Sequence, residues 1–311
     1  MGELIFAFVV VVIAMCSNAV EWEDPAVNAI NRLPQRTYSM PLAAEKDSLT
    51  DALEPETPYA VSLNGDWKFR WCGSPAQRVA NFFEEDFDDS KWNTIDVPSC
   101  VELRGYGSPD YTNVNYPHAK KPPFIRDRQF GTDDYNPVSA YRRTFVVPSA
   151  WKGRRVVLRF DGVYSAYWVW VNGRKAGYAE DSKLPSEFDV TPFLREGSNL
   201  LCVETYRWCD GSYLEDQDMF RFGGIFRDVT LFAKPQKAID DFAVKQKFSA
   251  DYASCEVSVE APEGCTAKLF DAAFGLVGEF APGKPLTVSP ARLWSAEDPY
   301  LYTLVLSNGE D

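Results

Sequence analysis

The residues SAYWVWVNG at 165–173 form a run of small, β-branched and aromatic residues that ends in Asn172-Gly173, a strong signal for a tight hairpin turn. Similar runs occur on both sides, separated by Gly, Pro, Asn and Asp: WKFRW (67–71), SAYRRTFVV (139–147), RRVVLRF (154–160), NLLCVETYRW (199–208) and FRDVTLFA (226–233). Alternation with a period of two buries one face of a strand. The sequence therefore predicts an all-β fold that begins with an antiparallel sandwich or barrel.

A second series of expected strands follows Lys234-Pro235, at 239–248, 255–261, 266–272 and 301–307. These strands predict a smaller, immunoglobulin-like sandwich over residues 236–311. Its last strand runs into Asn308-Gly309, and the sequence ends at Asp311. A hairpin turn without a returning strand leaves an unpaired edge, which globular proteins avoid. We therefore expect this sandwich to be incomplete and the natural polypeptide to continue.

The first 57 residues divide into two segments. Residues 4–15 (LIFAFVVVVIAM) are too short to span a bilayer and suit a signal-peptide core, with small residues for cleavage after Ala19. We expect a signal peptide at 1–19 and an exported protein, periplasmic or extracellular, that leaves the membrane after cleavage. Gly2-Glu3 replaces the usual basic start, so a cytoplasmic protein is the alternative, and Cys16 leaves lipidation open. Residues 20–57 contain four prolines and predict an extended arm.

The composition limits the classes of partner. Apolar residues make up 45% and charged residues 25%, as in soluble globular proteins, and the net charge is −13. This charge argues against nucleic acid and against an anionic membrane surface, because both need a basic footprint. The single histidine, His118, excludes a multi-histidine metal site. It stands between Tyr116-Pro117 and Lys120-Lys121, so we interpret it as a loop residue without a catalytic role.

The cysteines are scattered, without a C-x-x-C pair, at positions 16, 72, 100, 202, 209, 255 and 265. Six remain after signal cleavage, which is enough for disulfides in an oxidising compartment, but no framework spacing is visible. We expect most of them to be buried free thiols.

The segment 207–229, RWCDGSYLEDQDMFRFGGIFRDV, interleaves five carboxylates with three arginines and five aromatic residues. Carboxylates accept hydrogen bonds from hydroxyls, and flat apolar rings cover C–H surfaces. The segment therefore favours binding of a polyhydroxylated ligand. The alternative is a salt-bridged rim with a loop over a hydrophobic core.

Several longer phrases, in order along the chain, resemble the N-terminal part of glycoside hydrolase family 2 β-galactosidases of the large bacterial lactase type. These phrases are EWEDPAVNAINRLP (21–34), SLNGDWKFRW (62–71), YTNVNYPHAKKPPF (111–124), FDGVYSAYWVWVNGRKAGYAEDSKLPSEFDVTPFL (160–194), the segment 207–229 and LWSAEDPYLYTL (293–304). The resemblance implies a jelly-roll, galactose-binding-like domain at 58–235 and an immunoglobulin-like domain at 236–311. Both agree with the strand pattern.

The resemblance also implies a catalytic TIM barrel, which this sequence does not contain. In the family, two barrel glutamates act as acid/base and nucleophile in a retaining hydrolysis of terminal β-D-galactosyl residues. We therefore expect no catalytic residue in these 311 residues and no hydrolysis by this chain alone. The expected substrates are β-galactosides, with lactose, plant-wall galactans and host glycans all open. The arm assembles tetramers in some relatives, so a homo-oligomer is open as well.

Two residues are implied as substrate contacts. Asn113, in YTNV, resembles the residue that hydrogen-bonds the galactosyl ring, and an amide both donates and accepts. Asp218, in EDQDM, resembles the residue that contacts the 6-hydroxyl and ligates a monovalent cation, Na⁺. As alternatives, Asn113 serves only as a turn former, and Asp218 forms an exposed ion pair with Arg221 or Arg227.

A divalent cation, Mg²⁺, is implied at a second site. Glu21, Asp24, Glu180 and Asp210 match positions that hold such an ion in some relatives, although position 180 carries an amide in one of them. The alternative is that these acids are only solvated.

Two other functions stay open at this point. One is a non-catalytic carbohydrate-binding module, and the other is a scaffold made of two sandwiches. Fold alone does not choose among them. Asn113 and Asp218 favour a sugar site.

Overall fold

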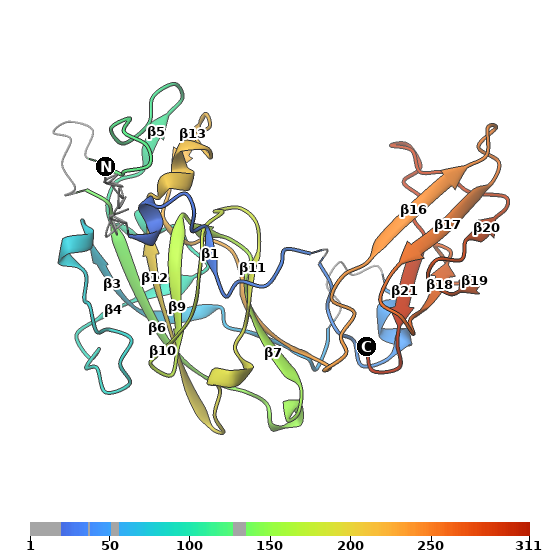
Figure 1. Ribbon diagram of the computed structural model, residues 1–311, viewed down its shortest axis with the longest axis horizontal. Coiled ribbons are helices and arrows are strands. Elements are labelled where there is room, and N and C mark those ends of the chain that lie inside the picture. The colour runs from blue at the N-terminus through green and yellow to red at the C-terminus, as the bar shows by residue number, and fades with distance from the viewer. Residues whose placement is uncertain (1–19, 37, 51–55, 127–134) are drawn as a thin grey trace, which may run out of the picture.

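A computed structural model describes residues 20–36, 38–50, 56–126 and 135–311. The regular structure of these residues consists of β-strands and short 3₁₀ helices, which confirms the predicted all-β class. Among them, no helix has the length and apolar character needed to cross a membrane. Figure 1 shows a larger sandwich built from the strands up to β15, and a smaller one built from β16 to β21. The predicted order of two consecutive sandwiches is confirmed.

The first sandwich packs a seven-stranded antiparallel sheet against a four-stranded one. The larger sheet has the order β1 (Ala29–Ile30), β10 (Arg174–Ala179), β9 (Ala166–Val171), β12 (Ser198–Tyr206), β6 (Val138–Val146), β3 (Gly65–Cys72), β4 (Asn93–Val97). The smaller sheet has the order β11 (Ser186–Asp189), β7 (Arg155–Phe160), β15 (Val229–Lys234), β2 (Ala60–Ser62).

The expected hairpin turn joins β9 to β10. Asn172 and Gly173 both have positive φ, 50° and 74°, as the tightest hairpin turns require. Val171 pairs with Arg174 directly across this turn. The turn prediction is therefore confirmed.

β9 differs from the expected pattern because both of its faces are buried. Its inner face joins the core between the sheets, which includes Trp67, Phe69, Tyr141, Phe160 and Phe188. Its outer face belongs to a second cluster, with Trp22, Phe82, Trp168, Trp170, Tyr178 and Tyr206. The arm supplies Trp22, whose ring stacks on Tyr206 at 3.9 Å between ring centroids. The prediction of one buried face was wrong for β9, because segments distant in sequence cover the other face.

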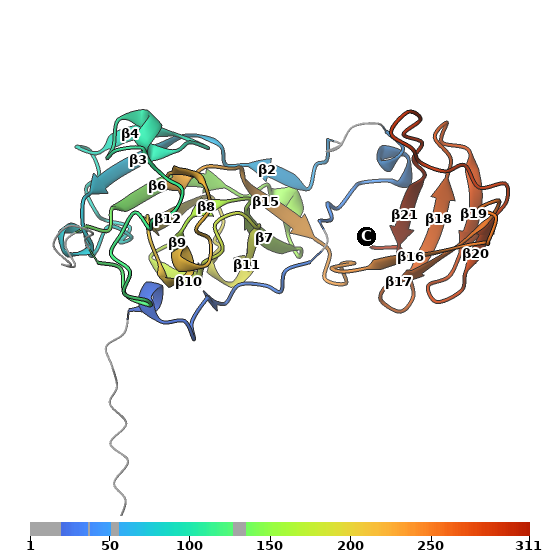
Figure 2. The same ribbon diagram turned by 90° about the horizontal axis from the view of Figure 1, so that it is seen from above.

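The arm runs along the first sandwich and continues to the second (Figure 2). It contributes β1 to the edge of the large sheet, where Ile30 pairs with Tyr178. Farther along, Glu45 forms an ion pair with Lys268 at 2.6 Å in the second sandwich. The arm therefore contacts both bodies.

The second sandwich has two three-stranded sheets. Their orders are β16 (Ala243–Phe248), β17 (Cys255–Glu260), β20 (Leu286–Val288), and β19 (Leu276–Phe280), β18 (Thr266–Phe270), β21 (Thr303–Ser307). In the register of β16 and β17, Val244 faces Val259 and Phe248 faces Cys255. Val244 and Phe248 thus share the inner face, yet they are 44% and 40% exposed, whereas Val259 is fully buried. This sandwich is open along β16.

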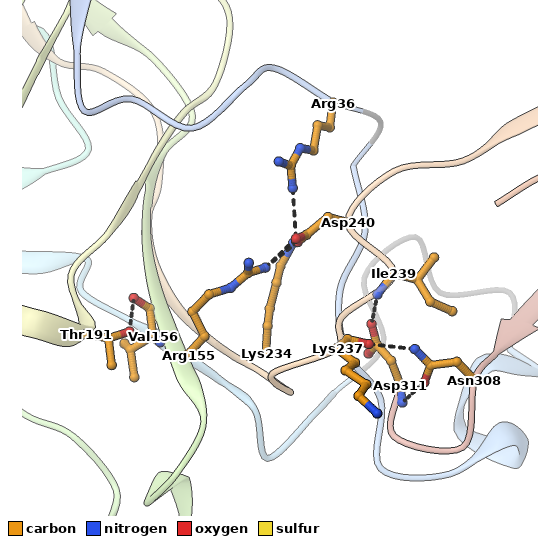
Figure 3. A network of polar contacts seen from close by, with 10 residues as sticks. All are labelled: Arg36, Arg155, Val156, Thr191, Lys234, Lys237, Ile239, Asp240, Asn308 and Asp311. Carbon is orange, nitrogen blue, oxygen red and sulfur yellow. Dashed lines mark hydrogen bonds and ion pairs between the residues drawn. The ribbon is translucent and has the colours of Figure 1, made fainter. Parts of the chain in front are cut away.

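The junction of the two bodies is held by polar contacts (Figure 3). The Asp240 carboxylate lies 2.5 Å from Arg155, 3.0 Å from Arg36 of the arm and 3.4 Å from Lys234. Although burial acts in the opposite direction, the Arg155 guanidinium holds the pKa of Asp240 below its usual value. The Asp311 carboxylate accepts a hydrogen bond from Ile239 N at 2.7 Å. A cavity of about 460 Å³ lies beside this junction, between the arm, the linker and β21.

Candidate functional site

Asn113 and Asp218 come together at the end of a small two-stranded ribbon. Its strands are β5 (Asp110–Thr112) and β13 (Met219–Arg221), and Thr112 pairs with Met219 in antiparallel register. Asn113 follows Thr112 and Asp218 precedes Met219, so both stand just beyond the same end of the ribbon. Both are exposed. The ribbon projects from one end of the first sandwich (Figure 1).

The Asp218 carboxylate is held by a neighbour on the opposite strand. Tyr111 Oη donates a short hydrogen bond to Asp218 Oδ1. This bond raises the pKa of the Tyr111 phenol, because the neutral phenol is the donor. Arg221 pairs with Asp216 at 2.5 Å, and Arg227 donates to Lys183 O at 2.7 Å. Among the described residues Asp218 has no ion pair, so the alternative pairing with either arginine was wrong.

The Asn113 carboxamide has no hydrogen-bond partner among the described residues. An amide that served only to form a turn would bond to nearby backbone groups. The structure shows no such bond within the described part of the chain. Asn113 therefore offers both a donor and an acceptor to solvent or to a ligand.

Arg207 holds the end of the β5–β13 ribbon that lies opposite Asn113 and Asp218. Its side chain is 2% exposed and lies 3.2 Å from Glu102 and 3.1 Å from Asp110. It also donates to Arg221 O at 2.7 Å. Glu102 in turn accepts a hydrogen bond from Gly223 N at 2.8 Å. One buried guanidinium thus fixes the base of both strands, which positions the residues at their exposed end.

The aromatic residues of 207–229 differ in exposure. Trp208 is 6% exposed and packs in the core, so it offers no open face. Phe220 is 55% exposed and lies across the ribbon from Tyr111, itself 56% exposed, with 5.5 Å between ring centroids. Tyr213, Phe222 and Phe226 are half-buried. Phe220 is thus the one exposed ring of the segment, and it lies with Tyr111 on the ribbon that leads to Asn113 and Asp218.

A second acidic cluster lies at the end of β10. Glu180 and Asp210 meet there with Cys209, and one ligand atom of each lies within 4.8 Å of the others. Asp210 begins the short 3₁₀ helix η7 (Asp210–Tyr213). Asp210 Oδ2 is buried and has no hydrogen-bond partner among the described residues. Tyr178 Oη donates to Glu180 Oε1 at 2.5 Å.

Burial dominates the electrostatics of this cluster. Desolvation raises the pKa of Glu180 to about 8, because two carboxyl groups are held together away from water. Burial also raises the pKa of the Cys209 thiol, so the sulfur is neutral. A cation would favour both carboxylates in their ionised form. The oxygens of Glu180 and Asp210 fit a hard divalent cation such as Mg²⁺, and the neutral thiol does not.

Glu21 and Asp24 lie in the arm near this cluster but outside it. The arm helix η1 (Glu21–Glu23) packs against η7, yet neither acid belongs to the group of ligand atoms within 4.8 Å. Asp24 Oδ1 accepts a hydrogen bond from Ala26 N at 3.1 Å. The four-residue set stays a prediction, of which the structure brings together Glu180 and Asp210.

Sequence reasoning missed Cys209 and Tyr111 as neighbours of these sites. Cys209 adjoins Asp210, which was the available signal, whereas Tyr111 becomes relevant only through the pairing of β5 with β13. His118 lies in a loop, as predicted, but it is buried. All six described cysteines are free thiols, and four of them are buried; Cys16 lies outside the described residues. The expected signal peptide also lies outside them.

Comparison with known proteins gives consistent results. The family "Glycosyl hydrolases family 2, sugar binding domain" matches residues 60–235. A β-galactosidase of Priestia megaterium is 40% identical over 315 residues, covering 92% of this chain; the chain spans about 30% of that relative.

Solved structures share the fold. A β-glucuronidase from an uncultured Clostridium has a TM-score of 0.62 at 24% identity, covering 84% of this chain and 45% of its own. The apo β-glucuronidase of Ruminococcus gnavus has a TM-score of 0.60 at 21% identity, covering 81% of this chain and 43% of its own.

Proposed function

Because the chain belongs to glycosyl hydrolase family 2, we propose that it supplies the sugar-contacting and linker domains of a β-galactosidase. The enzyme would hydrolyse terminal β-D-galactosyl residues by a retaining mechanism, with both catalytic glutamates outside these residues. The observation that carries the proposal is the exposed pair Asn113 and Asp218 at one end of the β5–β13 ribbon. Supporting it, the relative from Priestia megaterium is a β-galactosidase.

The two side chains suit a neutral sugar. The Asn113 amide can donate to one ring hydroxyl and accept from another. The Asp218 carboxylate, oriented by Tyr111, can accept a hydrogen bond from the 6-hydroxyl. A glucuronide carries a carboxylate at that carbon, and two like charges in contact repel. The absence of a described cationic partner for Asp218 therefore favours galactosides over glucuronides.

Two cations belong to the proposal. Asp218 would supply one oxygen ligand to Na⁺. Glu180 and Asp210, where η7 packs against the arm helix η1, would hold Mg²⁺. Na⁺ would bring positive charge next to the sugar hydroxyl, whereas Mg²⁺ would neutralise the buried acids. Export and homo-oligomerisation through the arm stay predictions.

A chimera tests this proposal. Residues 20–311 would replace the matching N-terminal part of the Priestia megaterium β-galactosidase, and turnover of nitrophenyl β-galactoside would be measured with and without sodium. We expect Asp218→Asn to lower kcat/KM by about 10–100-fold and to remove the sodium dependence, since a charged hydrogen bond contributes about 1.5–3 kcal/mol. Glu260→Gln, in the second sandwich, is the control. Unchanged turnover and sodium dependence in Asp218→Asn would refute the assignment.

The 311-residue chain itself should not hydrolyse galactosides. It should bind galactose more weakly than about 1 mM, because it presents only part of a pocket. Binding tighter than this without turnover would instead favour a carbohydrate-binding module that acts by itself.

A further inference from the structure

His118 joins two segments that are distant in sequence. It lies in the loop between β5 and β6 and is 4% exposed. Its ring stacks on Tyr116 of the same loop at 5.6 Å between centroids. On its other sides it meets Tyr213 at 4.7 Å and Trp208 at 5.6 Å, both from the segment 207–222. The imidazole is thus enclosed by three aromatic rings.

One nitrogen of this imidazole lacks a partner. Nδ1 lies 3.4 Å from Ala119 O. In the tautomer that donates from Nδ1, Nε2 carries a lone pair and must accept a hydrogen bond. Nε2 is buried and has no hydrogen-bond partner among the described residues. A buried acceptor without a hydrogen bond lowers the stability of the fold, unless a water molecule donates to it.

A small cavity adjoins His118. Its volume is about 20 Å³, which is room for one water molecule. Besides His118, the lining residues with polar or charged side chains are Tyr164, Ser165, Ser182, Arg207, Ser212, Glu215, Asp216 and Arg221. Two carboxylates and two guanidinium groups balance in charge, so the cavity favours a neutral occupant. These groups offer a bound water both donors and acceptors.

We propose that this cavity is the site of one buried water, which donates to His118 Nε2 and links it to the segment 207–222. His118 is thereby a positioning residue for the sugar-contacting pair. This inference rests on the proposed function, because it concerns how Asn113 is held near Asp218.

The position of His118 in the loop explains its effect. The β5–β13 pairing holds residues 110–112, and Tyr213 Oη accepts a hydrogen bond from Lys121 N at 3.0 Å. Between these two attachments lies the stretch that carries Asn113, five residues before His118. On the other side of the cavity, Asp216 stands two residues before Asp218. A link across the cavity therefore restrains both contact residues at once.

Protonation would break this link. Burial lowers the pKa of His118, and Arg221 acts in the same direction, whereas Asp216 opposes it. Arg207 and Glu215 also face the cavity, with opposite charges. Because the folded-state pKa is lower than the unfolded value of about 6.5, the link is complete above that pH. It weakens as the pH falls toward the folded-state pKa.

Hydrogen exchange of the 311-residue chain tests the inference without a ligand. His118→Phe keeps an aromatic ring but removes the acceptor, and His118→Gln returns a polar group. We expect His118→Phe to reduce protection of the Lys121 amide and the β5–β13 amides about tenfold, and His118→Gln to restore it. Amides of β12 serve as the internal control. The loss of protection in wild type at low pH should be absent from His118→Phe.

A high-resolution crystal structure of the wild-type chain tests the inference without any substitution. Water density within hydrogen-bond distance of Nε2 is expected, and a cavity without density would overturn the inference, as would unchanged exchange in His118→Phe. Turnover of nitrophenyl β-galactoside by the chimera separates the two proposals. If the exchange effect is present but Asp218→Asn leaves the turnover and the sodium dependence of the chimera unchanged, the proposed function fails and the buried-water link stands.

Discussion

The two sandwiches of this chain differ in what they leave exposed. In the first, both faces of β9 are buried, and polar side chains such as Asn113 and Asp218 are presented on a ribbon fixed from below by Arg207. In the second, Val244 and Phe248 face inward by register but remain about half exposed. Exposed polar residues on a rigid support suit recognition of a small polar ligand. The exposed inner-face residues leave the core of the second sandwich open to solvent along β16.

The largest expected contrast comes from the same substitution in each sandwich. Phe69 is fully buried, whereas Phe248 is 40% exposed. Phe69→Ala should destabilise the first sandwich by about 3–5 kcal/mol, because it leaves a cavity in a closed core. Phe248→Ala should cost less than about 1.5 kcal/mol. Urea denaturation followed by tryptophan fluorescence and by hydrogen exchange would measure both, and equal costs would contradict the contrast.

Ion pairs provide the next comparison. Arg207 and Glu102 are 2% and 1% exposed, whereas Lys245 and Glu260 in the second sandwich are 64% and 63% exposed. Arg207→Met should destabilise the chain by about 3–5 kcal/mol, since it leaves a buried carboxylate without its partner. Lys245→Met should change stability by only about 0–1 kcal/mol. Denaturant titrations of both variants would measure the two free energies of unfolding. A small effect of Arg207→Met would show that Arg207 is not what holds the β5–β13 ribbon in place.

Magnesium should stabilise the first sandwich alone. At a concentration 100 times the dissociation constant, a ligand adds about 2.7 kcal/mol to the folded state. In calorimetry, we expect Mg²⁺ to raise the unfolding temperature of the first sandwich, and EDTA to reverse this increase. Asp210→Asn should remove this response, because it removes one of the two buried carboxylates. A response retained in Asp210→Asn would place the ion elsewhere.

The pH dependence of stability should reveal Glu180. Its folded-state pKa of about 8 exceeds the unfolded value, so the folded state binds more protons between about pH 4.3 and pH 8. In EDTA, its contribution to stability should therefore be complete below about pH 4.3 and be lost as the pH rises toward 8. Glu180→Gln should flatten this part of the profile, with Glu260→Gln as the matched control. A profile for Glu180→Gln identical to wild type would show that the carboxyl is not protonated in the fold.

Local signals in the sequence were sufficient for the strands. The composition of 165–173 and Asn172-Gly173 identify β9 and its turn, because alternation and turn chemistry are encoded in adjacent residues. The burial of both faces of β9 was not predictable in this way. It depends on Trp22, which lies more than a hundred residues earlier and packs on Tyr206.

The candidate site was likewise only partly predictable from local sequence. Asn113 and Asp218 were identified through a resemblance, but their proximity arises from two strands of three residues each, too short for a periodic signal. Likewise, His118 was recognised as a loop residue, whereas its burial depends on Trp208 and Tyr213 from another segment. Residues brought together by long-range pairing cannot be recognised from neighbouring sequence alone.

A titration followed by NMR tests the central claim most directly. Methyl β-galactoside would be added to the isotope-labelled chain, and the side-chain amide of Asn113 and the backbone amide of Asp218 would be observed. We predict shifts at both residues, larger in sodium than in potassium, and none with methyl β-glucuronide. Galactoside-induced shifts confined to other parts of the chain, or equal shifts with the glucuronide, would contradict the account.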